Sequence, residues 1–137
     1  MFYNPEIGHN LPHDPFKAIV SPRPIGWIST IDKEKNVNLA PYSFFNAVAD
    51  NPPMIMFSIT GQKKNISSKD TLQNIIETKC FVVNVVSKDL LHQMNQTSGN
   101  YPKNTDEFIL ADLEKSDCVH IDAPRVKESP ASLECKL

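Results

Sequence analysis

Residues 62–71 carry the side chains best suited to holding an anion. The segment contains three lysines and three hydroxyl residues, and it runs into an amphipathic helical pattern over residues 69–79. Unpaired N–H groups and the dipole at a helix N-terminus favour an anion, and phosphate fits this set of donors. An ordinary capped helix after a solvated basic loop fits the same residues. No Walker or G-x-G-x-x-G pattern accompanies the segment.

A second candidate site lies in residues 38–47, where Ser43 and Asn46 interrupt an aromatic run. Buried polar groups there need partners, either from the protein or from a ligand with polar ring edges. Trp27, Ser29 and Thr30, on the preceding predicted strand, are candidates to face the same groove. An apolar wall with a few fixed donors suits a flat heteroaromatic ligand. A core strand with a proline bulge explains these residues equally well.

Other patterns of reactive side chains are weak. The 4 histidines have no metal-ligand spacing, and no G-x-S-x-G motif occurs. Cys80, Cys118 and Cys135 form no C-x-x-C pair, so neither a disulfide framework nor a zinc site is expected. Asp106 and Glu107 are adjacent carboxylates that we expect to be solvated. We therefore predict no metal site and no catalytic acid–base pair.

Charge and hydrophobicity argue against two classes of partner. The chain has 14 basic and 16 acidic residues and a net charge of -2, which disfavours binding to nucleic acid. No apolar run approaches the roughly 20 residues of a membrane span. Residues 1–6 lack the basic and apolar regions of a secretory signal, so we expect a cytoplasmic protein.

The predicted elements are mainly strands, and they indicate one domain over residues 1–137. Proline clusters bound short segments rich in β-branched and aromatic residues. The expected strands are residues 25–31, 38–48 with a bend near Pro41, 54–59 and 80–86, with weaker candidates at 119–121 and 131–137. The expected helices are residues 69–79, 87–97 and 106–113. This order favours an antiparallel barrel or sandwich with attached helices.

The last predicted strand, residues 131–137, is still alternating when the chain stops. Domains usually end in polar residues that are not tied down. We therefore expect a domain that is shortened at its C-terminal end.

Taken in order, these segments resemble the flavin reductase-like family, whose fold is the FMN-binding split barrel. The resemblance extends from about Phe16 to Leu137. The matching motifs are SPRPIGWIST (residues 21–30), NLAPYSFFN (38–46), NPPM (51–54) running into FS (57–58), KDTL (69–72), FVVN (81–84) and PRVKESP (124–130). Members continue beyond the position of Leu137 with strands that complete the barrel, and they commonly have a glycine where this chain has Glu34, Lys35 and Asn36.

The resemblance implies a flavin bound at a homodimer interface. It implies that Trp27, Ser29 and Thr30 line the flavin, and that Ser43 and Asn46 contact its ring system or ribityl chain. Ser58 is expected near the phosphate end. The residues expected to hold the phosphate are Lys64, Lys69 and Thr71, which agrees with the separate argument for an anion site.

The implied activity is transfer of a hydride from NAD(P)H to FMN, with the reduced flavin serving a partner monooxygenase or another acceptor. In such chemistry the cofactor carries out the hydride step, and the protein supplies binding, orientation and access. Two alternatives fit the same resemblance. One is an electron-transfer flavoprotein similar to flavoredoxin, and the other is a non-catalytic split-barrel protein that uses its groove for dimerisation or another ligand.

Overall fold

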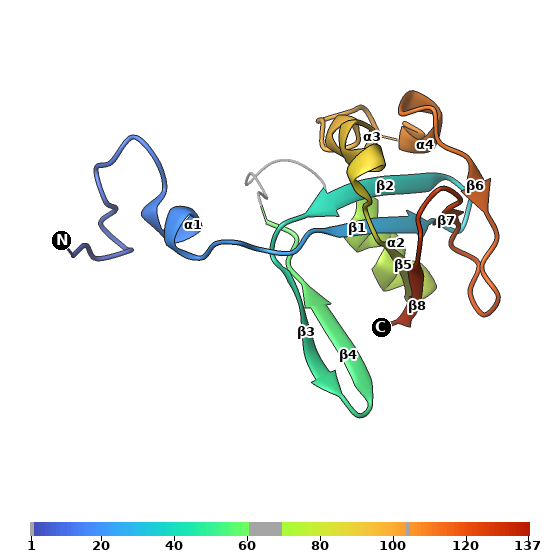
Figure 1. Ribbon diagram of the computed structural model, residues 1–137, viewed down its shortest axis with the longest axis horizontal. Helices are drawn as coiled ribbons and strands as arrows, with labels where there is room; N and C mark the ends of the chain where they lie inside the picture. The colour runs from blue at the N-terminus through green and yellow to red at the C-terminus, as the bar shows by residue number, and fades with distance from the viewer. Residues whose placement is uncertain (1, 61–69, 104) are drawn as a thin grey trace.

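An antiparallel sheet forms the body of the protein (Figure 1), in a computed structural model that describes residues 2–60, 70–103 and 105–137. The sheet has four strands in the order β2-β1-β5-β8. Their bounds are β1 Gly26–Ile31, β2 Val37–Tyr42, β5 Cys80–Asn84 and β8 Ser132–Lys136. β1 pairs with β2 from Gly26↔Tyr42 to Ile31↔Val37, as expected for a hairpin that turns at residues 32–36.

A second, two-stranded sheet projects from the end of β2. It is a hairpin of β3 (Phe45–Asp50) and β4 (Pro53–Phe57), and Figure 1 shows it extending well away from the main sheet. The predicted strand 38–48 therefore divides into β2 and β3. The predicted bend exists, but it lies at Ser43 and Phe44, two to three residues after Pro41, which stays inside β2 opposite Trp27.

Short helices cover both faces of the main sheet. They are α2 (Asp70–Thr78), the 3-10 turn η1 (Lys88–Leu90), α3 (Leu91–Gln96) and α4 (Glu107–Leu110), whereas α1 (Pro15–Ile19) lies away from the sheet (Figure 1). The predicted helix 87–97 is thus η1 followed by α3. The described residues contain no strand at 119–121. A two-residue pair, β6 (Lys115–Ser116) with β7 (Arg125–Val126), flanks that region instead.

The two faces of β1 belong to different parts of the core because neighbouring strand residues point to opposite sides. Ile28 packs with Ile75 of α2 and with Phe81 and Val83 of β5. Trp27 packs on the other side in a cluster with Phe108 of α4. Within the described residues, no helix is long and apolar enough to span a membrane.

Candidate functional site

Thr71 lies in the first turn of α2 and anchors that end of the helix to β2. Its hydroxyl oxygen accepts hydrogen bonds from the Asn38 amide (2.7 Å) and from the Tyr42 hydroxyl (2.8 Å), and only 1% of the residue is exposed. Burial raises the pKa of Tyr42, opposed in part by the hydrogen bond to Thr71, so the phenol stays protonated at neutral pH. The N-terminal turn of α2 is therefore held against the end of β2.

Ser43, Asn46 and Ser58 gather at the base of the β3–β4 hairpin. Phe45 pairs with Phe57, and the Ser58 N–H donates to the carbonyl oxygen of Phe44 (2.8 Å), which places Ser58 beside the bend that holds Ser43. All three polar residues are exposed. Among the residues that the structure describes, the hydroxyls of Ser43 and Ser58 make no hydrogen bond.

Tyr42 connects these two groups of residues. It precedes Ser43 in the chain, its hydroxyl reaches Thr71, and its ring lies 5.2 Å from the ring of Phe57, centroid to centroid. Polar donors therefore lie next to aromatic surface around the end of β2. This is the combination that a planar heteroaromatic ligand with a charged tail requires.

Trp27, Ser29 and Thr30 have a different environment, because all three are fully buried. The Trp27 indole N–H donates to the Thr97 hydroxyl (2.9 Å), and the Ser29 hydroxyl donates to the Pro124 carbonyl (2.5 Å). The Thr30 hydroxyl oxygen accepts from the Asn74 amide (3.0 Å). Each side chain is bonded to a protein partner, so these residues hold β1 in place within the core.

Asn84 joins this buried network and was not among the residues expected from the sequence. Its amide donates to the Trp27 carbonyl (3.1 Å) and to the Ser29 hydroxyl oxygen (3.0 Å). Its side-chain oxygen accepts from the Val126 N–H (2.8 Å) and from the Ser132 hydroxyl (3.2 Å). A lone amide at the end of the apolar run FVVN was the available signal, since a buried polar group needs partners.

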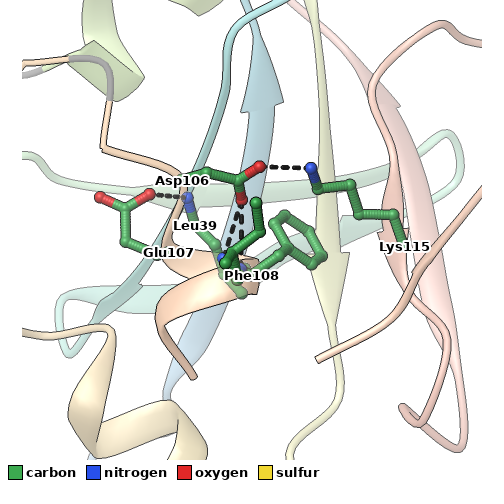
Figure 2. Close-up of polar contacts among 6 residues, drawn as sticks. Leu39, Asp106, Glu107, Phe108 and Lys115 are labelled. Carbon is green, nitrogen blue, oxygen red and sulfur yellow. Dashed lines mark hydrogen bonds and ion pairs between the residues drawn. The ribbon is translucent and has the colours of Figure 1, made fainter. Parts of the chain in front are cut away.

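The expectation that Asp106 and Glu107 are both solvated is wrong for Glu107. It is 8% exposed, and its carboxylate accepts a 3.0 Å hydrogen bond from the Leu39 N–H (Figure 2). Burial raises the pKa of Glu107, although the hydrogen bond from Leu39 opposes this effect. Asp106 caps α4 by accepting from the N–H groups of Phe108 and Ile109, and it pairs with Lys115. Glu107 thus attaches α4 to β2, and Asp106 caps α4 and links it to β6.

A polar cavity of about 240 Å³ lies between the β1–β2 turn and α2. Its walls include four carboxylates and two lysines: Asp32, Glu34, Asp70, Glu77, Lys33 and Lys103. An excess of negative charge disfavours a phosphate there. Lys64 and Lys69, the other residues predicted to hold phosphate, lie outside the described residues.

The sequence profile described as "Flavin reductase like domain" matches residues 20–137. The chain belongs to the flavin reductase-like family. This match confirms the resemblance seen in the sequence motifs, and it supports a flavin as the cofactor class.

Similar proteins agree with this assignment. An uncharacterized protein from Aquifex aeolicus is 45% identical over 120 residues, which cover 88% of this chain and 61% of that protein. Nitrilotriacetate monooxygenase component B from Bacillus cereus has a similar structure, with a TM-score of 0.87 and 36% identity over 100% of this chain and 67% of its own.

A flavin reductase-like protein from Shewanella frigidimarina, described as having a split barrel domain, matches with a TM-score of 0.74 and 29% identity. That match covers 83% of this chain and 55% of the Shewanella protein. The predicted fold class, a mainly antiparallel split barrel with a few helices, is thereby confirmed. The chain spans about three fifths of the length of its Aquifex relative.

The residues of this flavin reductase-like chain fit FMN in chemical type. Thr71 lies at the N-terminus of a nine-residue helix, where a phosphate is favoured. The exposed hydroxyls of Ser43 and Ser58 and the amide of Asn46 are neutral groups suited to ring carbonyls or ribityl hydroxyls.

Proposed function

We propose that this chain is the FMN-binding domain of an NAD(P)H-dependent flavin oxidoreductase. The observation that carries the proposal is the Tyr42 link, which joins the N-terminal turn of α2 to the exposed donors beside Ser43. When bound, FMN supplies the hydride-accepting chemistry. The family match supports the assignment to flavin chemistry.

The proposed roles of the described site residues are based on the surroundings of their side chains, and those of Lys64 and Lys69 are based on the family resemblance. Thr71 and the N-terminus of α2 hold the phosphate, together with Lys64 and Lys69, and Ser58 lies towards that end. Ser43 and Asn46 orient the ring system or the ribityl chain. The buried residues Trp27, Ser29 and Thr30 form the wall that keeps β1 rigid behind the site. We assign no side chain as a catalytic acid or base, so the chain's contribution is binding, orientation and access.

The β3–β4 hairpin is the surface that we assign to a second copy of the chain. Val48, Met54 and Met56 are 54%, 49% and 57% exposed on it. A projecting hairpin with such apolar side chains is typical of an interaction surface. A homodimer formed through this hairpin places the second copy next to Ser43 and Asn46, at the base of the same hairpin.

Further partners follow from the activity. NAD(P)H is the hydride donor, and the reduced flavin is passed to a partner monooxygenase or another acceptor. One structural relative is itself a monooxygenase component B, which supports an oxygenase as that partner. We place the protein in the cytoplasm, where its proposed donor is found. The net charge of -2 gives no reason to expect nucleic acid as a partner.

Two measurements on the same protein sample test this proposal. Titration with FMN, followed by flavin fluorescence, is expected to show saturable quenching. Anaerobic mixing of the loaded protein with NADH or NADPH in a stopped-flow instrument is then expected to bleach the flavin absorbance. Binding without bleaching would contradict the reductase assignment and favour an electron carrier that takes electrons from a protein. Absence of binding would contradict the flavin assignment and favour a non-catalytic split barrel.

A further inference from the structure

The N-terminal arm, residues 2–20, lies outside the main sheet and ends in α1. Figure 1 shows it extending away from the strands on the side where β2 gives way to β3. α1 contains no buried residue, and Phe16 and Ile19 are 54% and 79% exposed. The arm is therefore held by a few specific contacts and not by burial in the core.

Arg23 makes the contacts that hold this arm together. One nitrogen of its guanidinium, Nη1, donates to the Lys17 carbonyl (2.6 Å) and also to the Val20 carbonyl. Both carbonyls lie at the C-terminal end of α1, where free carbonyl groups favour a cation. Arg23 is thus the C-terminal partner of a short helix that has few other supports.

The same guanidinium also connects the arm to the candidate site. Its central carbon lies 5.7 Å from the centroid of the Phe44 ring, a cation–π contact, and the Phe16 ring of α1 lies 6.3 Å from that ring. Phe44 follows Ser43, and its carbonyl accepts from the Ser58 N–H. Phe44 is therefore the point at which the arm meets the base of the hairpin.

The contact is incomplete, because the Arg23 Nε is buried and has no hydrogen-bond partner among the described residues. A buried donor without an acceptor opposes the docked state. The docked state is therefore only weakly favoured, so loss of the Arg23 hydrogen bonds to the Lys17 and Val20 carbonyls is expected to shift the arm measurably towards the undocked state.

We propose that Arg23 is a positioning residue of the flavin site. It docks the N-terminal arm on Phe44, and the docked α1 covers the Ser43 side of the site and slows the escape of bound FMN. The docking of the arm on Phe44 is inferred from the contacts of Arg23 and does not depend on the proposed function. The part that concerns FMN rests on the proposed function.

Limited trypsin digestion of the protein without flavin tests the docking. Trypsin cleaves after Lys17, and the carbonyl of that bond is the one to which Arg23 donates. Arg23→Gln is expected to speed cleavage at Lys17–Ala18 several-fold, and Phe44→Leu is expected to do so as well. Arg23 itself is a poor trypsin site because Pro24 follows it. Lys35→Gln is the control, since it removes an exposed cation outside the arm that pairs only with Asp122 among the described residues.

The dissociation rate of FMN and the visible circular dichroism of the bound flavin test the second part. Arg23→Gln is expected to increase the dissociation rate several-fold and to alter the dichroism, and Arg23→Lys to restore part of both by keeping the charge. The fluorescence of the fully buried Trp27 verifies that each variant is folded.

Each outcome bears on one part of the inference. Cleavage at Lys17 that is as slow in Arg23→Gln as in the wild type would overturn the docking. Faster cleavage with unchanged FMN dissociation and dichroism would overturn the role of the arm in the site. A wild-type protein that binds no FMN would contradict the proposed function and the FMN part of this inference, while the digestion would still decide the docking.

Discussion

The hydroxyl of Tyr42 donates a 2.8 Å hydrogen bond to the hydroxyl of Thr71, 29 positions further along the chain. This bond links the last residue of β2 to the first turn of α2. The Asn38 amide shares the same acceptor from four residues earlier on β2. Because Ser43 directly follows Tyr42, this bond also fixes the position of Ser43, at the ring end of the proposed site, relative to Thr71, at the phosphate end.

Replacing Thr71 with valine tests this junction. Thr71→Val keeps the shape but removes the hydrogen bonds that Thr71 accepts from the Tyr42 hydroxyl and the Asn38 amide, so unfolding free energy should fall by about 1–3 kcal/mol. FMN affinity should fall about tenfold, which corresponds to about 1.4 kcal/mol. Urea unfolding and FMN titration measure the two effects. Thr78→Val, at the other end of α2, is the control and should leave FMN affinity unchanged.

Glu107 should make stability depend on pH. Its pKa is raised above its ordinary value of 4.5, so the folded state favours the protonated acid. The stabilisation is fully present below about pH 4.5 and is lost as pH rises through the higher folded pKa. Glu107→Gln removes this titration and keeps an acceptor for the Leu39 N–H, so the variant should gain stability relative to the wild type as pH rises. If the wild type and Glu107→Gln show the same pH dependence in urea unfolding, burial does not raise the pKa of Glu107.

Asn84 should be among the most sensitive core positions. Asn84→Leu has a similarly branched side chain but removes four hydrogen bonds, including that of the Val126 N–H. We expect a loss of more than about 3 kcal/mol in unfolding free energy, because several buried groups lose their partners together. Thermal and urea unfolding would measure it. Asn95→Leu, at an exposed position on α3, should change stability little.

The hairpin surface should control the oligomeric state. Met56→Lys places a charge on the exposed face of β4, and a dimer formed there would have to desolvate it. The variant should sediment as a monomer at concentrations where the wild type is a dimer. Ile109→Lys changes a residue on α4 that is 75% exposed and should leave the dimer intact. A wild-type monomer, or a dimer that tolerates Met56→Lys, would contradict this interface.

The sequence was sufficient to predict the family, the strands of the main sheet and the position of α2. These features depend on local patterns, such as alternation, proline placement and the apolar face of a helix, and the order of the motifs supports them. Alternation along β1 places Trp27 and Ser29 on one side and Ile28 and Thr30 on the other, so the expectation that Trp27, Ser29 and Thr30 share one groove did not follow the strand pattern.

Only the tertiary structure decided which residues cover each side of β1. Trp27, Ser29 and Thr30 were expected to face a groove, but they bond to Thr97, Pro124 and Asn74, which come from distant parts of the chain. Glu107 has the sequence context of a surface residue. Its carboxylate is nevertheless buried, because it accepts a hydrogen bond from the Leu39 N–H on β2, an edge strand of the sheet. A strand pattern shows which residues share a face, but burial depends on contacts between segments whose approach no local pattern encodes.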